Sequence, residues 1–516
     1  MKKPSLFGIN GLLLSNFLLQ FGFSMVGIFV PLYIYKITHS FFWILGFFLL
    51  LDLIIIIFTL PTARLIAKFG SDKIYFTGAI LRSIFLVLLI LAGRELFFLI
   101  PAVFFWGLAV PFCWLPFHLS VVGTDHTLSF GKDVAKISFT GKVGSIAGPI
   151  LGGIIIQTLS FNSLYVVSLA FVIISGLPLF FDRYEFKFPE ITLKTLGNNL
   201  PIKQMPRLFL GFFGVGLIDR FQSIVWPIYV FLLASSYQFL GTITSISLLA
   251  SFILLVIVRN LANRFGGKIL KISVPINILN WLSRIFIISG QLSLFLVDLA
   301  YQLVSIFIWV PFDRLAYQTA VQTKKLEYFL SRELAIHFGS FVATMILIFS
   351  LGLFGLNWPM AFTLSALSLL FILQLGFAKE EGMKSAGVVL IRKDGSTLMI
   401  LRDSKKDISF PNHWCMPGGK VEIGETPQTA AHRELTEETG YRAQSLNLLA
   451  EETYSLPSGQ KITRHIFWTE YDENQELTCL EGQRIKFLKL ADMADKKIFP
   501  GHKEFCQQAL IKSKSL

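Results

Sequence analysis

Long apolar runs separated by short polar stretches fill the first three quarters of the chain. A helix that crosses a bilayer needs about 20 mostly apolar residues, and about twelve runs reach this length. They begin near residues 8, 41, 74, 98, 139, 162, 208, 239, 270, 291, 336 and 358. A content of 53% hydrophobic and only 15% charged residues agrees with this reading. The pattern predicts an all-α, polytopic membrane domain over residues 1–380.

A polar linker at 379–384 leads into a segment with a different pattern, which predicts a second domain over residues 384–516. Its apolar runs are short and alternate with turn residues, which is typical of strands, and a Lys-Asp-Gly turn at 393–395 predicts a β-hairpin. Strands are expected at 385–391, 398–401, 446–455 and 462–471, and a terminal helix at 501–513. This order suits a mixed sheet packed between helices.

Positive charge marks one side of the expected membrane domain. Lys and Arg gather in loops such as 64–73, 183–207 and 259–268, whereas the opposite loops are nearly uncharged. Basic loops remain in the cytoplasm, and an even number of spans places both termini there. We therefore expect a multi-pass cell-membrane protein with a cytoplasmic C-terminal domain. The same loops account for the net charge of +13, so the lipid bilayer is an expected partner and nucleic acid is not.

The membrane segment contains an internal repeat. Residues 67–73, AKFGSDK, follow the second run, and residues 263–268, NRFGGK, follow the eighth. Arg82 in the third run has a counterpart, Arg284, in the ninth. Two six-helix halves joined by a longer loop at about 183–206 form a layout typical of transporters.

In this layout the chain resembles the major facilitator superfamily. The Phe-Gly loops are similar to the family's loop between helices 2 and 3, although Ala67 and Asn263 replace its usual acidic residue. Residues 148–153, GPILGG, are similar to its glycine-proline motif in helix 5, where small residues allow close helix contact. The resemblance implies a transporter for a solute that the motifs do not identify.

Charges inside membrane spans are costly and mark candidate functional sites. Asp219 and Arg220 lie within the seventh run, Asp52 within the second and Asp298 within the tenth. These are candidates for binding a proton or a solute, and a purely structural pair within the bundle is the alternative. His118 follows a Trp-Leu-Pro-Phe stretch and is expected at the edge of a loop.

Three glutamates near the C-terminus form the clearest chemical feature. Glu434, Glu437 and Glu438 have the spacing i, i+3, i+4, which places them on one face of a helix. Like charges so close destabilise a helix unless a hard cation neutralises them, and carboxylates are the ligands that Mg²⁺ or Mn²⁺ prefers. Gly418 and Gly419 precede the helix and allow the backbone to approach a ligand.

The segment GKVEIGETPQTAAHRELTEETGY, residues 419–441, resembles the signature of the Nudix hydrolases, G-x5-E-x7-R-E-U-x-E-E-x-G-U. Only the last position departs, with a tyrosine in place of an aliphatic residue. The resemblance implies an α/β/α sandwich that hydrolyses nucleoside diphosphates linked to another group. It covers about residues 384–516.

The resemblance also assigns roles to these residues. Glu434, Glu437 and Glu438 would hold Mg²⁺ or Mn²⁺, and one of them, or an outlying glutamate, would prepare the water. Arg433 would orient the glutamates through an ion pair, for which Glu425 is the expected partner. Gly418 and Gly419 would form the turn, and Gly440 would end the helix. Glu437, Glu434 and Arg433 are thus the candidate catalytic residues.

The tail of the domain is similar to that of MutT-type enzymes, which hydrolyse nucleoside triphosphates. The likeness rests on residues 480–483, LEGQ, on Phe487 and on residues 499–502, FPGH. It implies Glu481 as a fourth metal ligand, with an exposed loop glutamate as the alternative, and it points to Phe499 and His502 at the nucleotide. His502 stands where those enzymes have an asparagine, which removes the paired donor and acceptor edge of an amide.

Three functions are compatible with these patterns. The first is a membrane-anchored, Mg²⁺-dependent pyrophosphohydrolase, with a nucleoside triphosphate as the favoured substrate and ADP-ribose or a nucleotide sugar as alternatives. The second is a transporter whose C-terminal domain senses a nucleotide. In the third, the enzyme processes what the carrier moves. The intact glutamates favour catalysis, because a sensor has no need of all three.

Overall fold

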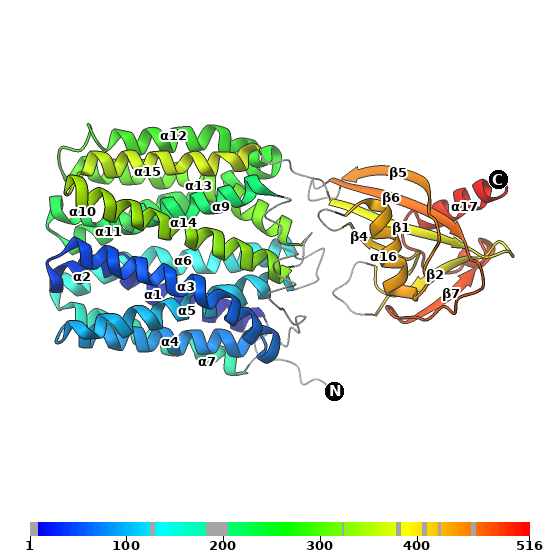
Figure 1. Cartoon of the computed structure of the whole chain (residues 1–516), viewed down its shortest axis with the longest axis horizontal. Coiled ribbons are helices and arrows are strands. Elements are labelled where there is room, and N and C mark those ends of the chain that lie inside the picture. Colours follow the sequence, from blue (N-terminus) through cyan, green and yellow to red (C-terminus); the bar gives the residue numbers. More distant parts are fainter. Residues whose placement is uncertain are drawn as a thin grey trace. The chain divides into compact units, whose positions relative to one another are not determined.

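The computed structural model describes residues 9–123, 130–181, 205–321, 325–377, 383–404, 410–421, 425–455 and 461–515. The chain divides into two compact units, a helical one within residues 1–379 and a second one formed mainly by residues 380–516 (Figure 1). Each unit is described by itself. The exact boundary that the sequence places at 380–384 stays a prediction.

The first unit consists of long helices (Figure 1). Nine of the helical segments in its described part are long and apolar enough to cross a membrane, so the predicted polytopic character is confirmed, whereas the count of twelve stays a prediction. The helices are α1 (Ile9–Gly27), α2 (Val30–Thr38), α3 (Phe41–Phe69), α4 (Ser71–Ala92), α5 (Leu99–Gly123), α6 (Phe130–Thr158), α7 (Phe161–Phe181), α9 (Pro206–Arg220), α10 (Trp226–Ala234), α11 (Tyr237–Phe265), α12 (Leu270–Ser283), α13 (Gln291–Val321), α14 (Lys325–Phe354) and α15 (Trp358–Leu373).

Helix α14 begins at Lys325, well before the apolar run that predicted its start near 336. The extra turns contain Arg332 and Glu333, which are buried and paired with each other at 2.6 Å. Because the bundle satisfies these charges internally, the helix continues where hydropathy alone predicts a loop.

Glycines allow two pairs of helices to approach closely. A Cβ at Gly148 or Gly152 of α6 would overlap Ser24 or Met25 of α1, which confirms the close contact predicted for the 148–153 segment. A Cβ at Gly216 of α9 would likewise overlap the carbonyl of Ile336 in α14. The backbones of α9 and α14 therefore lie against each other, and side chains near this crossing are held close together.

The second unit is built on a mixed sheet with the strand order β3-β2-β1-β6-β5, in which β4 also pairs with β1 and β7 with β2. Strands β1 and β6 are parallel, and the other pairs are antiparallel. The strands are β1 (Met383–Ile391), β2 (Thr397–Leu401), β3 (Trp414–Cys415), β4 (Gly418–Lys420), β5 (Asn447–Ser455), β6 (Lys461–Glu470) and β7 (Arg484–Leu488).

Two helices, α16 (Pro427–Thr439) and α17 (His502–Ser513), cover opposite faces of this sheet. Because side chains alternate along a strand, Val388 and Leu390 of β1 join the core formed with α16, whereas Val389 and Ile391 join the core formed with α17. The predicted sheet between helices is thus present, and it fixes one end of α16 next to β4.

Candidate functional site

Helix α16 carries the predicted glutamates, and its ends are set by its sequence. The Thr426 side chain caps the N-terminus by accepting from the Thr429 amide, and Gly440 ends the helix with φ of 75°. Glu438 Oε2 accepts a hydrogen bond from the Gly418 amide at 2.9 Å. A Cβ at Gly419 would overlap the Glu434 carboxylate. The two glycines therefore let β4 pass directly against two carboxylates.

Arg433 is the centre of the polar contacts at this site. Its guanidinium donates to both Glu425 oxygens at 3.0 and 3.1 Å, so the predicted ion pair is present. It also donates to Glu434 at 2.7 Å, to Glu437 at 3.1 Å and to the carbonyl of Lys420 at 2.9 Å. One guanidinium thus connects the helix, the preceding loop and β4.

The crowding of carboxylates changes their acidity. Burial, together with the charges of Glu434 and Glu481, raises the pKa of Glu438 to about 8, although the Gly418 amide opposes the shift. Burial also raises the pKa of Glu434, with Arg433 opposing it. A raised pKa disfavours the ionised carboxylate, and a bound cation would favour it.

Glu481 reaches the same cluster from a distant part of the sequence. Its loop is fastened to the end of α16, because the Thr478 amide donates to the Thr439 carbonyl and the Leu480 amide to the Glu438 carbonyl, both at 3.0 Å. The Glu481 carboxylate is exposed and contributes to the raised pKa of both Glu434 and Glu438. The Glu481 carboxylate is therefore near enough to act electrostatically on Glu434 and Glu438.

The donor set fits a hard divalent cation by its chemistry. All four side chains offer carboxylate oxygens, which suit Mg²⁺ or Mn²⁺, and the partly buried Glu438 lacks a cationic partner of its own at hydrogen-bond distance in the described part of the chain. Over those residues, no three His, Cys, Asp or Glu side chains converge on one point, because Glu434 and Glu437 both turn toward Arg433.

Phe499 and His502 lie together at the start of α17, with ring centroids 4.6 Å apart. The Met416 amide donates to His502 Nδ1 at 3.0 Å, so the ring proton lies on Nε2. Burial, with Arg464 and Arg402 nearby, lowers the pKa of His502 to about 3, so the ring is neutral. Sequence reasoning missed Phe410, whose ring lies 4.8 Å from that of Phe499. The residues around it in the sequence match no motif and gave no signal.

In the membrane unit the structure joins two of the predicted charges. Arg220 donates to both oxygens of Asp52 at 2.6 and 2.7 Å, and both side chains are buried. Asp219 is exposed and interacts electrostatically with this pair. Asp298 lies elsewhere, where it accepts from the Trp226 indole at 2.7 Å.

Sequence reasoning was wrong about His118, which is buried within α5. Pro116 suggested the end of a helix, but the helix continues past it to Gly123. Arg332 donates to His118 Nε2 at 2.9 Å, and Nδ1 contacts the Tyr317 hydroxyl at 2.8 Å. These partners come from α14 and α13, far away in the sequence, so no local pattern reveals them.

Comparisons with known proteins agree with both units. The family model for the Major Facilitator Superfamily matches residues 12–323, and that for the NUDIX domain matches residues 383–509. The chain is 34% identical over 109 residues to the 8-oxo-dGTP diphosphatase of Escherichia coli (strain K12), covering 20% of this chain and 80% of that protein. It is 39% identical over 84 residues to the RNA pyrophosphohydrolase of Erythrobacter litoralis (strain HTCC2594), covering 16% of this chain and 49% of that protein.

Among solved structures, the Escherichia coli fucose:proton symporter FucP has the same fold as the helical unit. The alignment has a TM-score of 0.54 at 16% identity, and it covers 73% of this chain and 100% of that one. At this identity the likeness shows the fold alone. Both family resemblances found in the sequence are thereby confirmed.

Proposed function

The chain belongs to the Major Facilitator Superfamily and carries a C-terminal NUDIX domain, and from this premise we propose that it is a membrane-anchored Nudix pyrophosphohydrolase. The observation that carries the proposal is the cluster of Glu434, Glu437 and Glu438 on α16, held by Arg433 and pressed against Gly418 and Gly419. A domain that only binds nucleotides has no need of this complete set of carboxylates.

Nudix hydrolases generally use Mg²⁺ or Mn²⁺, and the residues present fit such an ion. Glu434, Glu437, Glu438 and Glu481 would hold it, and when bound it would neutralise charge on a diphosphate and acidify a water molecule. The protein contributes the arrangement. Arg433 keeps Glu434 and Glu437 side by side, and the Gly418 amide fixes one oxygen of Glu438.

The reaction would be attack of water on a phosphorus atom of a phosphoric anhydride. Glu437 and Glu434 are the proposed groups that take the proton from the attacking water. The Glu437 side chain is 60% exposed, whereas the Glu434 side chain is 15% exposed, so Glu437 is the more accessible to water. Arg433 acts through both by positioning their carboxylates.

A nucleoside triphosphate is the favoured substrate, since the chain covers most of the length of an 8-oxo-dGTP diphosphatase. The rings of Phe410, Phe499 and His502 form an aromatic group on which a base can stack. The neutral His502 offers one N–H donor in place of an amide edge. ADP-ribose and nucleotide sugars are the alternative substrates.

The membrane unit would place this activity at the bilayer. Its basic loops favour an orientation in which both termini and the NUDIX domain are cytoplasmic, where nucleotides and Mg²⁺ are available. The domain boundary at about 380–384 and the twelve-helix, two-half layout belong to this proposal. The second candidate function is a transporter that the NUDIX domain regulates by binding a nucleotide.

One experiment separates the two candidates. The full-length protein, purified in detergent with Mg²⁺, is incubated with nucleoside triphosphates, 8-oxo-dGTP, ADP-ribose and nucleotide sugars, and both product release and ligand binding are measured. Turnover of one class supports the hydrolase and identifies its substrate. Tight binding of one nucleotide without turnover, equal in the wild type and in the Glu437→Gln variant, supports the sensor instead.

A further inference from the structure

An apolar groove lies on the surface of the membrane unit, between the first turns of α3 and α5. It has a volume of about 270 Å³ and is lined by Phe42, Trp43, Gly46, Phe47, Leu50, Leu99, Ile100 and Val103. Gly46 leaves the groove open at one point, because a Cβ at this position would meet no other atom within 4 Å. The groove is independent of the NUDIX domain and of its proposed activity.

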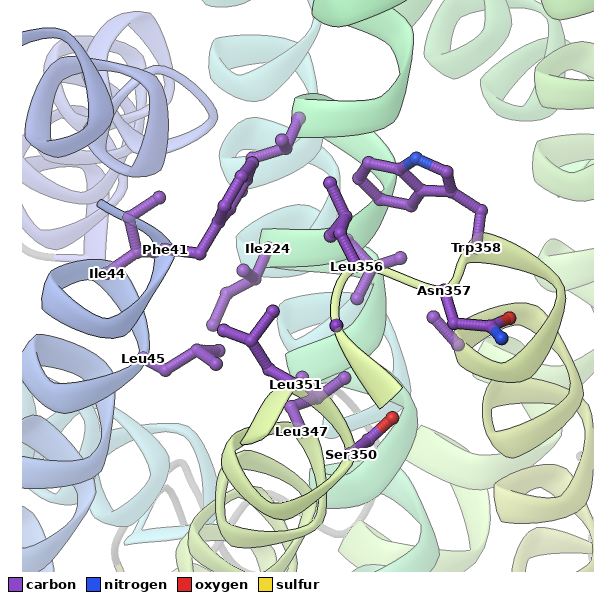
Figure 2. Close-up of a pocket in the computed structure, with 14 residues that line it drawn as sticks. Phe41, Ile44, Leu45, Ile224, Leu347, Ser350, Leu351, Leu356, Asn357 and Trp358 are labelled. Atoms are coloured by element: carbon purple, nitrogen blue, oxygen red, sulfur yellow. The ribbon is translucent and has the colours of Figure 1, made fainter. Parts of the chain in front are cut away.

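The two faces of α3 differ in their surroundings. Ile44 and Leu45 are buried and line a pocket that α3 shares with α14 (Figure 2). The exposed residues recur every three or four positions and therefore share the other face. They are Trp43, Gly46, Leu50, Leu53 and Ile57. Since α3 is long and apolar enough to cross a membrane, this exposed face contacts the acyl chains of the bilayer, and the groove opens on it.

The length of the groove matches one leaflet of a bilayer. From Phe42 to Leu50, α3 rises by about 12 Å, and half of the hydrocarbon core of a bilayer is about 15 Å thick. The lining residues belong to the first third of α3 and to the first turns of α5. Both helices begin at the same end of the unit, because the single span α4 separates them. This end lies opposite to the basic loop at 64–73.

Basic side chains lie at the end of the unit where the groove begins. Arg94 is exposed and lies in the loop that leads from α4 to α5. Lys36 is exposed near the end of α2, and its neighbour Tyr35 stacks on Phe41, the first residue of α3, with ring centroids 4.8 Å apart. Glu95 is exposed as well. Two positive charges and one negative charge leave this region with one net positive charge.

Lys36 and Arg94 belong to one locality. Tyr33 of α2 donates to the carbonyl of Leu89 in α4 at 2.8 Å, and its hydroxyl lies 2.8 Å from the position that a Cβ of Gly93 would take. Lys36 follows Tyr33 by three residues, and Arg94 follows Gly93 directly. Basic residues at a membrane surface attract anionic headgroups, and a guanidinium pairs with a phosphate through two hydrogen bonds.

The headgroup decides which lipid is favoured in the groove. An acyl chain gains little by moving from the bilayer into an apolar groove, because lipid chains are as apolar as the side chains that line it. One basic residue at the surface, in contrast, enriches anionic lipids about fivefold. The indole of Trp43, which is 46% exposed, suits the boundary between acyl chains and headgroups.

We propose that the groove between α3 and α5 binds one acyl chain of an anionic glycerophospholipid, whose phosphate lies near Arg94 and Lys36. The chain lies along Gly46, with Trp43 and Ile100 beside it. The site prefers a lipid with a net negative headgroup to a zwitterionic one. The occupant is a component of the membrane, whatever solute the unit carries.

The test labels the groove with lipid. The full-length protein is placed in phosphatidylcholine vesicles that contain a little phosphatidylglycerol with a photoactivatable diazirine in one acyl chain. After illumination, mass spectrometry compares the label on residues 42–50 and 99–103 with the label on a reference face of α11 at Ile253 and Ile257, which are 68% and 56% exposed. A parallel sample with diazirine phosphatidylcholine gives the headgroup preference.

At low ionic strength, phosphatidylglycerol is expected to label the groove at least about fivefold more than phosphatidylcholine does, whereas the reference face should show no preference. The preference should fall at about 1 M salt, where the Debye length is about 3 Å. Arg94→Gln should remove most of the preference, because it takes away the net positive charge. Glu95→Gln should increase it.

Filling the groove tests the acyl chain separately from the headgroup. Gly46→Leu should reduce the label on the groove to the level of the reference face, because its side chain enters the open space at this position. The matched control is Gly352→Leu in α14, since a Cβ at Gly352 would also meet no atom within 4 Å. This control should keep the wild-type labelling pattern.

Equal labelling of the groove by the two lipids would overturn the proposal, because any surface that faces the bilayer gives that result. Groove peptides that neither lipid labels would overturn it too, since another occupant, such as a second copy of the chain, then covers them. If Gly46→Leu does not elute as a folded protein, Arg94→Gln decides the matter. An unchanged headgroup preference in that variant contradicts the proposed site.

Discussion

Replacing Arg433 by alanine tests how the glutamates of α16 are held in place. Its guanidinium donates to Glu425, Glu434 and Glu437 and to the Lys420 carbonyl, all within 3.1 Å. The change removes every one of these donors at once. It takes the Arg433 guanidinium away from two side chains, Glu425 and Glu434, which are only 13% and 15% exposed.

The size of the effect follows from this exposure. Hydrogen bonds to charged groups contribute about 1.5–3 kcal/mol each when they are buried, whereas an exposed pair such as that with Glu437 contributes less than about 1 kcal/mol. Since water partly replaces the lost donors, we expect the domain to lose about 2–4 kcal/mol of stability. A similar loss of transition-state positioning lowers kcat by about 30- to 1000-fold.

The assay is pyrophosphate release by the full-length protein with saturating Mg²⁺, together with thermal unfolding of the NUDIX domain by calorimetry. Arg433→Lys keeps the charge but loses the planar fork, so stability should recover largely while kcat remains at least about tenfold low. Arg442→Ala, an exposed arginine, serves as the control. A kcat for Arg433→Ala within about twofold of the wild type refutes the positioning role.

Three further predictions concern the same domain. The Cβ introduced by Gly419→Ala would overlap the Glu434 carboxylate and should displace it. In a metal titration, the affinity for Mg²⁺ and kcat should therefore each fall by at least about tenfold. Because the pKa of Glu438 is raised from about 4.5 to about 8 in the fold, the folded state keeps a proton that the unfolded state has lost, so metal-free stability should fall as pH rises from about 4.5 to about 8. Glu438→Gln should abolish this part of the slope in calorimetric scans. His502→Ala should raise KM for a nucleoside triphosphate by about 3- to 30-fold in steady-state kinetics, with kcat little changed, because it uncovers Phe499 and leaves the Met416 amide without its acceptor.

The local parts of the candidate site could be predicted from the sequence. The spacing of Glu434, Glu437 and Glu438 places them on one face of a helix. The contact between Arg433 and Glu425 is also local, because Glu425 lies just before the start of the same helix. Local spacing does not place Glu481, because its position depends on a loop fastened to the end of α16. Its motif suggested a role as a metal ligand, which stays a prediction, and the fold lets its charge act on Glu434 and Glu438.

The membrane site was beyond the reach of sequence patterns. Asp52 and Arg220 were singled out separately as charges in apolar runs, but nothing local indicates that they pair across 168 residues. Glu333 was missed because α14 was expected to begin near 336, whereas the helix begins at Lys325. Polar residues such as Arg332 and Glu333 lower the local hydropathy, so a hydropathy pattern predicts a loop where α14 is helical.

The most direct test of the central proposal is Mg²⁺-dependent pyrophosphate release by the full-length protein, compared with its Glu437→Gln/Glu438→Gln variant and with Glu476→Gln, an exposed glutamate outside the cluster. The proposal predicts that the double variant loses at least about a thousandfold in kcat/KM while Glu476→Gln keeps the wild-type rate and all three proteins unfold cooperatively. Equal rates in the double variant and the wild type would contradict it.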